Sequence, residues 1–541
     1  MTRPVEVAAT GAAAEAVATV VPRLVEERFA SRLFDRDPRL WSADSESEAA
    51  VRLSWVGLAR TSRPLVDEIR ALRAELDGQD VDHVVLCGMG GSSLAPEVIC
   101  AAAGVELTVL DSSHPDQVRA ALADRLARTV VVVSSKSGST VETDSQRRAY
   151  TEAFESAGID PRLRMVIVTD PDSPLDKQAR NAGYRVFNAD PNVGGRYSAL
   201  TAFGLVPSGL AGADIARLLS DAEAATEHLA KDEAENPGLR LGAALAGTTP
   251  LRDKLVIVNE GSGLPGFADW AEQLVAESTG KQDTGLLPVV VADSSAPEVA
   301  LPPHDVTVAR LVAQTDAGAG QATQADGSDV YVAGALGAQL LLWEVATAVA
   351  GGILGINPFD QPDVESAKNA AREMLRGEPA RAPADVTDGS VEIRALGGDW
   401  LGSAANLSDA VGELLGQLDQ NNGYVAVLAY LDRLALPHLE DVRRTLAVRT
   451  KRPVTFGWGP RFLHSTGQFH KGGPPVGVYI SITAEPTQDL PVPGQGFSFG
   501  TLIAAQAAGD AQVLADHSRP VLQLHLTDQD VGVRALLKAL A

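Results

Sequence analysis

The sequence predicts an α/β protein built from doubly wound parallel sheets. Short runs of apolar and β-branched residues alternate with helix-length stretches along most of the 541 residues. Continuous apolar runs of this kind are typical of parallel strands that helices cover on both faces. A chain of this length exceeds one hydrophobic core, which favours two to four domains.

An N-terminal helical segment is expected over residues 1–78, because Leu24, Phe29 and Leu33 recur at helical spacing. The first α/β domain is expected over 79–245. Its strands are predicted at 83–87, 106–110, 129–134 and 165–169.

A second α/β domain is expected over 246–384 and a C-terminal α/β region over 385–541, packed with the second domain. The boundary falls in 377–388, which is rich in Pro, Ala and Asp and is typical of a linker. The second domain contains predicted strands at 254–258 and 287–291 and a long helix around 334–350. The C-terminal strands are predicted at 423–429, 476–482 and 521–526.

Composition excludes several classes of partner. With 46 basic and 70 acidic residues the formal net charge is -24, which disfavours binding to nucleic acid or to an anionic membrane. Only Cys87 and Cys100 are present, so we expect a reducing compartment. Glu6 and Glu15 interrupt the Ala-rich N-terminus, and we expect neither a signal peptide nor a membrane span. A cytoplasmic protein is predicted.

Two loops of small residues follow neighbouring predicted strands. Residues 88–93 are glycine- and serine-rich, and 135–143 combine Ser, Thr, Gly and Lys136 ahead of a predicted helix. Hydroxyls and backbone N–H groups at a helix N-terminus favour a phosphate dianion. Ser139 and Glu142 could instead form a structural capping box. Walker A and dinucleotide-binding sequences are absent, so the two loops together predict a phosphate site of another kind.

Arg196 lies in a glycine-containing loop, 192–198, after another strand-like run. The glycines would let a ligand approach the backbone, and the guanidinium would offer planar donors to a developing oxyanion. A tight turn with a surface salt bridge explains the same residues, and without further context it is the favoured interpretation.

Glu277 lies on an apolar helix face. It follows Trp270 by seven residues, close to the predicted helix end, with Gly280 expected at the C′ position. Burial and the helix dipole both disfavour the ionised carboxylate there, which suits a general base acting near neutral pH. The alternative is a structural glutamate paired with a nearby lysine.

Lys368 raises a similar choice. A helix opening at Asp360 would put Lys368 on the apolar face that contains Val364 and Ala371. A desolvated ammonium group usually meets an anion, although a lysine at the edge of an apolar face can also extend its tip to water. The segment alone leaves both interpretations open.

Together these segments resemble the glucose-6-phosphate isomerase (phosphoglucose isomerase) family, which is built from two sugar isomerase domains. The family's Gly-Gly-Arg-Tyr/Phe-Ser signature matches 194–198, and its Gly-Gly-Ser loop matches 90–92. Its Glu-Ser-Asn-Gly-Lys motif matches 277–281 with Thr279 for Asn. A fourth signature matches 359–368, except that Asp363 replaces a glycine. Aspartate tolerates positive φ better than most residues. The four motifs occur in the family's order and cover roughly residues 30–370.

The resemblance implies interconversion of glucose 6-phosphate and fructose 6-phosphate through a cis-enediolate, with no metal and no cofactor. Glu277 would move the proton between C1 and C2, Arg196 would stabilise the enediolate, and Lys368 would assist ring opening. The implied substrate-binding residues are Ser92, Ser135, Lys136, Ser137, Thr140, Thr143, Gly195 and Gln361.

The ring-opening histidine is where the chain departs from the family. His304 is the only histidine between Glu277 and Lys368, and its Pro-Pro-His-Asp setting does not match the family's pattern. A better local match lies at 462–473. We therefore expect His464 to open the ring, because histidine exchanges protons near neutral pH and this loop follows the strand-like run 453–456.

Two alternatives remain. A non-catalytic sugar-phosphate-binding regulator could use the same domains, although binding alone would not require Glu277, Arg196 and Lys368. The isomerase half of an amidotransferase is disfavoured because the chain begins Met1-Thr2 and offers no N-terminal cysteine. We expect a small-molecule sugar phosphate as the ligand, while the use of mannose 6-phosphate, a homodimer and the role of residues 385–541 stay open.

Overall fold

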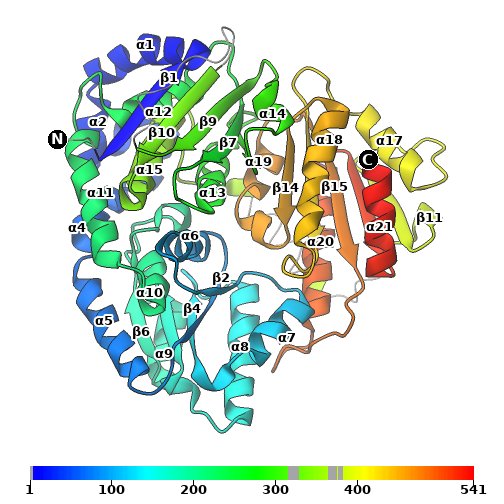
Figure 1. Ribbon diagram of the computed structural model, residues 1–541, viewed down its shortest axis with the longest axis horizontal. Helices are drawn as coiled ribbons and strands as arrows, with labels where there is room; N and C mark the ends of the chain where they lie inside the picture. Colours follow the sequence, from blue (N-terminus) through cyan, green and yellow to red (C-terminus); the bar gives the residue numbers. More distant parts are fainter. Residues whose placement is uncertain (1–3, 315–327, 364–373, 376–381) are drawn as a thin grey trace.

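Three β-sheets, each flanked by helices, form the computed structural model of the chain, which describes residues 4–314, 328–363, 374–375 and 382–541 (Figure 1). Apart from one N-terminal strand that joins the second sheet, the sheets follow one another along the chain. This arrangement confirms the α/β fold class with parallel sheets that the alternating apolar runs predict.

The first sheet is entirely parallel, in the order β3-β2-β4-β5-β6. Its strands are β2 (His83–Gly88), β3 (Thr108–Leu110), β4 (Thr129–Ser134), β5 (Met165–Thr169) and β6 (Arg185–Asn188). One face packs on α5 (Pro64–Asp77), α6 (Leu94–Ala103) and α10 (Ala202–Ala211). The other packs on α7 (Pro115–Ala123), α8 (Val141–Ser156) and α9 (Pro174–Ala182). Every residue of β2 and β4 is buried, which explains their continuous apolar sequence.

The second sheet has the order β1-β10-β9-β7-β8. Its strands are β7 (Lys254–Glu260), β8 (Leu287–Val291), β9 (Val306–Val312), β10 (Ser328–Gly334) and β1 (Val5–Thr10). The prediction of a wholly helical N-terminal segment is wrong here, since β1 pairs antiparallel with β10 before α1 (Gly11–Glu26) begins. Six residues carry too little periodicity to reveal a strand whose partner is more than 300 residues away.

The third sheet has the order β11-β12-β16-β15-β13-β14. Its parallel strands are β13 (Tyr424–Tyr430), β14 (Val454–Trp458), β15 (Gly477–Ala484) and β16 (Val521–Leu526), and β11 (Val386–Asp388) and β12 (Val391–Leu396) form an antiparallel edge. The predicted linker therefore extends too far, because Val386–Asp388 is a strand. Residues 377–381 of that linker lie outside the described residues.

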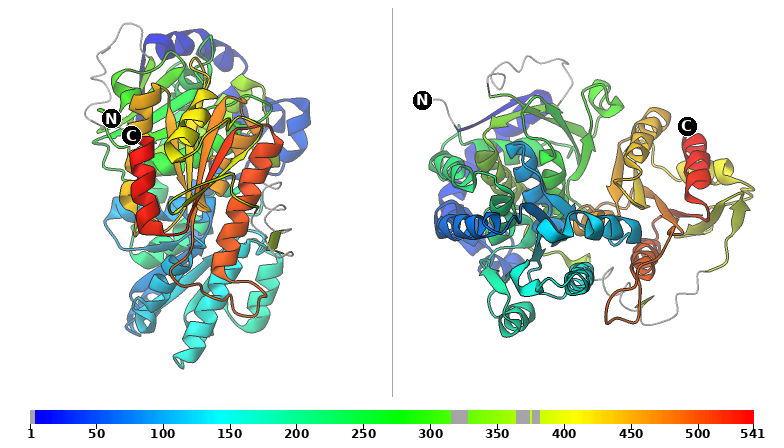
Figure 2. Two further views of the ribbon diagram at one scale, coloured as in Figure 1. Left: turned by 90° about the vertical axis from the view of Figure 1, so that its right-hand side faces the viewer. Right: turned by 60° about the horizontal axis from the view of Figure 1, so that its bottom comes forward.

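The C-terminal α/β region, residues 385–541, which we call the third region, packs beside the first two domains (Figure 2). Val256 and Leu287 of the second sheet share one apolar cluster with Ala426 and Tyr479 of the third. A buried ionic group joins the same two regions: Asp305 contacts both the Lys254 ammonium, at 3.1 Å, and the Arg452 guanidinium.

The helix α15 (Leu336–Leu354) has the length and composition of a membrane span, but 83% of its apolar window is buried inside the protein. It packs against α11 (Ile215–Leu229), α12 (Pro237–Ala246) and α13 (Phe267–Thr279). We therefore assign α15 as the central core helix, which is mostly apolar because helices cover it on several sides.

The buried ionic group predicts a large effect for Asp305→Ala. Losing this carboxylate leaves the Arg452 guanidinium, which is 3% exposed, without its ionic partner. Breaking a buried pair from one side costs about 3–5 kcal/mol. We expect the free energy of unfolding in denaturant to fall by that amount. Asp399→Ala at an exposed position is the matched control, with an effect within about 0.5 kcal/mol. A loss for Asp305→Ala as small as the control's would contradict the structural role of this group.

Candidate functional site

The predicted phosphate loop lies between β4 and α8, at the carboxyl edge of the first sheet, where ligands of such sheets bind. The Ser135 hydroxyl donates to Thr140 Oγ1 at 3.2 Å and accepts from the Gly138 N–H at 3.1 Å. The Ser137 and Ser139 hydroxyls are 2.7 Å apart. Thr140 is the N-cap residue of α8, and its side chain does not cap the helix. The loop therefore presents hydroxyls beside the positive end of a helix that lacks a capping side chain.

Three other predicted ligands surround this loop. Lys136 Nζ donates to Asp170 Oδ2 at 2.5 Å, so a carboxylate at the end of β5 already neutralises this lysine. Thr143 is buried in the first turn of α8. Ser92 ends the 3-10 turn η4 (Gly90–Ser92), and a Cβ at Gly88, at the start of the same loop, would lie 3.3 Å from the Cβ of Ser134, the residue before the phosphate loop. The small residues thus bring the two loops close together.

Arg196 lies in the 3-10 turn η7 (Gly195–Tyr197), packed under the Gly90–Ser92 turn. A Cβ at Gly91 would lie 2.0 Å from the Gly195 carbonyl oxygen, so only glycine fits there. The Arg196 side chain is 2% exposed, which excludes the interpretation as a surface salt bridge.

Every nitrogen of the Arg196 guanidinium has a partner. Nε donates to Ser278 Oγ at 2.7 Å and Nη1 to Gln361 Oε1 at 2.7 Å. Nη2 donates to the carbonyls of Pro358 and Asp360 at 2.8 and 3.0 Å. The structure therefore brings Arg196 together with Gln361 and with the residue that follows Glu277.

Glu277 lies near the C-terminus of α13, with its side chain 12% exposed. Its Oε1 is 3.4 Å from Arg196 Nη1, and its Oε2 accepts from Gln273 Nε2 at 3.1 Å. The carboxylate is thus held between a guanidinium and an amide. Gln273 is not among the predicted site residues, although its position four residues before Glu277 places both side chains on neighbouring turns of one helix.

Gly280 ends α13 for a different reason from the predicted one. It is the C-cap residue with φ of -75°, not a left-handed C′ glycine. A Cβ at this position would lie 2.5 Å from Phe469 Cα in α19 (Gly467–Gly472). Gly280 therefore permits close approach of the third region to the end of the helix that contains Glu277.

Lys281, directly after Gly280, is buried and fixes the neighbouring segment. Its Nζ donates to the Asn357 carbonyl at 2.8 Å and to the Asp360 carbonyl and Oδ1 at 2.6 and 2.7 Å. Burial, and then the charge of Arg196, lower the pKa of Lys281 to about 8. The Asp360 carboxylate opposes that shift, so the ammonium still anchors the segment that presents Gln361. Lys368 lies outside the described residues.

His464 ends the 3-10 turn η9 (Arg461–His464), which follows β14 in the third region. Its Nε2 is 3.1 Å from Glu142 Oε1, and its backbone carbonyl accepts from Gln273 Nε2 at 2.7 Å. The alternative of a Ser139–Glu142 capping box does not hold, because Thr140 is the N-cap residue of α8, and the buried Glu142 carboxylate meets a histidine from another region. His304 is exposed and precedes β9 at the opposite, amino end of its strand.

An ionic contact that the sequence does not predict fixes the position of η9. Arg461 Nη1 and Nη2 lie 2.6 Å from Asp111 and from Glu97, two carboxylates of the first domain. Arg433 of the third region joins the same two carboxylates at 3.5 and 3.3 Å. Pairing across three segments leaves no periodic signal in any one of them.

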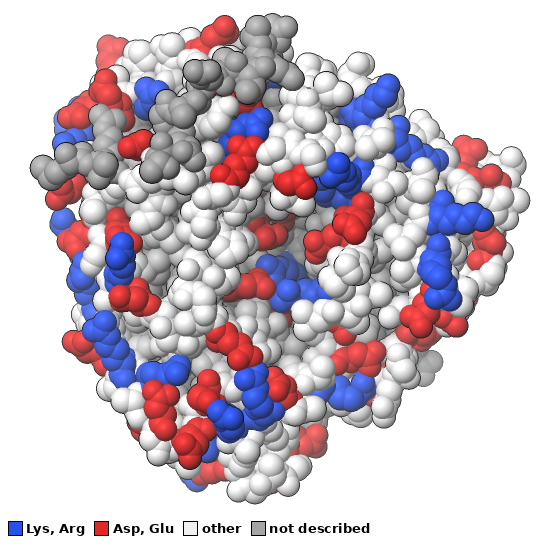
Figure 3. Space-filling model, viewed as in Figure 1, with Lys and Arg blue, Asp and Glu red and all other residues white. Residues whose placement is uncertain are grey.

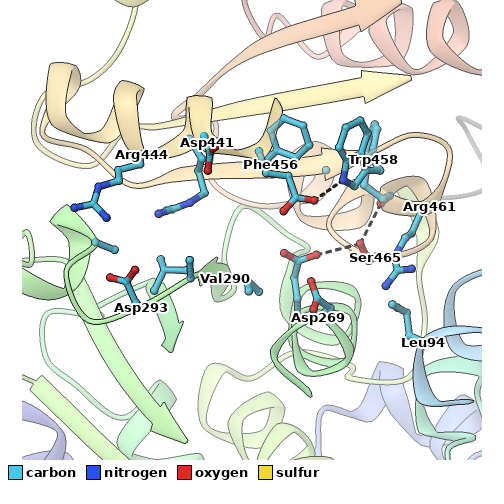
Figure 4. A pocket seen from close by; sticks show the side chains of 18 residues that line it. Leu94, Asp269, Val290, Asp293, Asp441, Arg444, Phe456, Trp458, Arg461 and Ser465 are labelled. Atoms are coloured by element: carbon cyan, nitrogen blue, oxygen red, sulfur yellow. Dashed lines mark hydrogen bonds between the residues drawn. The ribbon is translucent and has the colours of Figure 1, made fainter. Parts of the chain in front are cut away.

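A separate cavity of about 380 Å³ lies beside η9, lined mainly by residues of the second domain and the third region, with Leu94 of the first domain (Figure 4). None of the predicted site residues that the structure describes lines it. Asp269, Glu272 and Glu440 face this cavity together with Trp458 and Arg461. Burial, and then the Asp269 charge, raise the pKa of Glu272 to about 8, although Arg461 opposes this shift.

The surface seen in Figure 3 shows acidic and basic side chains interspersed over the whole face, so the net charge of -24 is not gathered there into one patch. This face therefore offers an anionic ligand no broad basic surface, and the local positive charge comes from Arg196 and the α8 N-terminus.

Comparisons with known proteins show which proteins this chain resembles. The family model described as phosphoglucose isomerase matches residues 49–284. A probable glucose-6-phosphate isomerase of Natronomonas pharaonis is 32% identical over 428 residues, which are 70% of this chain and 98% of the relative. A glucose-6-phosphate isomerase of Rubrobacter xylanophilus is 32% identical over 366 residues, 55% of this chain and 83% of that protein. The crystal structure of a hypothetical protein from Thermus thermophilus aligns with a TM-score of 0.59 at 26% identity, covering 69% of this chain and all of that one.

The raised pKa of Glu272 predicts how stability depends on pH. The folded protein holds this proton up to about pH 8, whereas an ordinary glutamate loses it near 4.5. Between those values the unfolded chain binds fewer protons, so stability falls as pH rises. Glu272→Gln removes this loss. We therefore compare the free energies of unfolding of the variant and of the unmodified protein. The difference, variant minus unmodified protein, should become more positive from pH 5 to pH 9.

Denaturant unfolding at the two pH values measures this difference. Glu413→Gln, at an exposed position on α17 (Leu407–Gly416), is the control and should show no such change. A relative stability of Glu272→Gln that is the same at both pH values would contradict the assignment.

Proposed function

The chain belongs to the phosphoglucose isomerase family, and on that premise we propose that it is an enzyme that interconverts glucose 6-phosphate and fructose 6-phosphate. The observation that carries the proposal is the contact between Glu277 and Arg196, with Oε1 and Nη1 3.4 Å apart. Binding a sugar phosphate requires only the loops at the first sheet. A carboxylate held beside a buried guanidinium is what an enediolate mechanism additionally requires.

Glu277 acts as the base that carries a proton between C1 and C2. The Gln273 amide holds Oε2 and orients the carboxylate toward the bound sugar. Arg196 offers the positive charge that favours the enediolate over the neutral sugar. Since all three of its nitrogens are already held by Ser278, Gln361 and backbone carbonyls, the guanidinium need not reorganise during the reaction.

The phosphate group is held by Ser135, Ser137, Thr140 and Thr143 with the N-terminal N–H groups of α8. Ser92, Lys136 and Gly195 lie around this loop or beside Arg196, and Gln361 bonds Arg196 directly. Binding energy at the remote phosphate can be used at the reacting carbons. Lys368 completes the set as the residue that assists ring opening, on the strength of the family signature.

His464 opens the sugar ring. Its Nε2 faces the Glu142 carboxylate, which accepts hydrogen bonds only, so Nδ1 is the nitrogen left to exchange a proton with the sugar. The Gln273 amide donates both to Glu277 and to the His464 carbonyl, which supports proton transfer and ring opening at neighbouring points of one site. We also place the enzyme in the cytoplasm, where its two free buried cysteines stay reduced.

The function is tested by an assay that converts fructose 6-phosphate to glucose 6-phosphate with a chelator present. We expect turnover in the unmodified protein and a fall of about 10²–10⁴ in kcat for Glu277→Gln, the usual contribution of a general base. Glu272→Gln, on the same helix but facing the separate cavity, is the matched control and keeps its turnover. No turnover in the unmodified protein, or near-normal turnover in a folded Glu277→Gln variant, would overturn the proposal.

The two histidines are distinguished by separating ring opening from proton transfer. We expect His464→Ala to lose turnover of the cyclic sugar phosphate while it still exchanges the C1 or C2 proton of an open-chain analogue with solvent. His304→Ala, at an exposed position, is the control and should match the unmodified protein in both measurements. The reverse result, with loss only in His304→Ala, would transfer the role to His304.

A further inference from the structure

A series of hydrogen bonds links the third region to the Glu142 carboxylate, which faces His464. The series begins at Gln506 on α20 (Phe499–Asp516), a residue that is 3% exposed. Gln506 Nε2 donates to Glu142 Oε1 at 2.7 Å, and Gln506 Oε1 accepts from the buried Ser113 hydroxyl at 2.6 Å. Ser113 follows β3 in the first domain, so these hydrogen bonds connect the first domain with the third region.

The orientation of the Gln506 amide is fixed by chemistry. An ionised carboxylate only accepts hydrogen bonds, so the amide NH₂ group must face Glu142 and the amide oxygen must face Ser113. The Ser113 hydroxyl can donate to that oxygen. Reversing the amide would set its oxygen against the Glu142 carboxylate, which is repulsive.

The same carboxylate oxygen serves two donors. Glu142 Oε1 lies 2.7 Å from Gln506 Nε2 and 3.1 Å from His464 Nε2. An sp² oxygen has two lone pairs and can therefore accept from both groups. Each hydrogen bond requires its donor to lie near a lone-pair direction, so both form together only when the Glu142 side chain is held in one rotamer. The 2.7 Å hydrogen bond from Gln506 contributes to that constraint at the oxygen that faces His464.

We propose that Gln506 is a positioning residue for ring opening: it holds Glu142 so that its Oε1 accepts the Nε2 proton of His464, which keeps Nδ1 of the neutral ring free to take a proton from the sugar. Gln506 itself does not touch the substrate. The inference rests on the proposed function for its catalytic consequence, but the tautomer that it assigns to His464 can be measured without any turnover.

The inference also gives the region 385–541 a role. This region supplies His464 through η9 and Gln506 through α20, and both side chains converge on Glu142 of the first domain. Ring opening then depends on the third region, whereas the proton transfer at Glu277 and Arg196 depends on residues of the first two domains.

The test is Gln506→Met, which keeps nearly the same side-chain length and removes both hydrogen bonds. The matched control is Gln512→Met on the same helix, where the amide is exposed and donates to Asp516. Ser113→Ala is the second variant, because it removes only the hydrogen bond that holds the amide oxygen. Thermal unfolding verifies that each variant folds.

The first measurement is the ¹⁵N NMR spectrum of the histidine rings in the full-length protein at neutral pH. The unmodified protein and Gln512→Met should show His464 with its proton on Nε2, and Gln506→Met should show a shift toward a mixture of tautomers. His464→Ala identifies the resonance. A His464 spectrum that is the same in Gln506→Met and in the unmodified protein would overturn the proposal.

The second measurement is kinetic. Gln506→Met should lower kcat on the cyclic sugar phosphate about tenfold, the effect of losing one hydrogen bond to a charged group, with KM nearly unchanged. Proton exchange at C1 or C2 of an open-chain analogue should stay at the level of the unmodified protein, and Ser113→Ala should show a smaller loss of the same kind. Equal losses in both reactions would indicate a general structural effect and overturn the positioning role.

The two proposals fail in different ways. If the unmodified protein does not isomerise the sugar phosphate while the His464 tautomer still depends on Gln506, the proposed function is wrong and the positioning of His464 is upheld. If turnover occurs and the tautomer is independent of Gln506, the positioning role is wrong and the proposed function stands.

Discussion

The buried guanidinium of Arg196 is the point on which the arrangement of the site depends. An arginine that is 2% exposed must satisfy its donors inside the protein, since an unpaired buried charge is costly. Its partners come from two other segments: Ser278 beside Glu277, and the 358–361 stretch that includes Gln361. The hydrogen bonds of the Arg196 side chain therefore fix both the segment that contains Glu277 and the predicted substrate-binding residue Gln361. Lys281 strengthens this link, because its ammonium binds Asn357 and Asp360 from the end of the same helix.

Ion pairs as well as apolar packing hold the third region against the first two domains. Arg461 pairs with Asp111 and Glu97 at 2.6 Å, three residues before His464, and so holds the η9 turn against the first domain. Buried ionic contacts are weak as sources of net stability, because desolvation offsets most of their attraction. They are strong determinants of register, since only one placement pairs every charge. We infer that the ion pairs of Arg461 serve chiefly to place the histidine.

The sequence predicts the parallel strands and the signature residues because both leave local signals: valine-rich runs for β2 and β4, and glycines where Gly91 meets Gly195. It does not predict β1, because the partner strand β10 lies more than 300 residues further along the chain. For Glu142 the sequence offers only a local capping box as an alternative, because His464 and Gln506, which contact its carboxylate, are more than 300 residues away. Gln273 could have been found from its spacing to Glu277. What the sequence misses are contacts between distant segments, which no periodicity encodes.

The replacement at Asp363 shows how the third region and the family signature fit each other. Asp363 does not adopt the positive φ that a glycine there would suggest. Its Oδ2 accepts from Gln468 Nε2 at 2.6 Å, and its backbone N–H donates to Gln468 Oε1 at 3.1 Å. The same Gln468 amide donates to the Gly280 carbonyl at 2.9 Å. One side chain of α19 therefore joins the end of the Glu277 helix to the start of the segment that leads to Lys368. Because a glycine could not offer the carboxylate, the aspartate is explained by the presence of the third region and not by a change in the local turn.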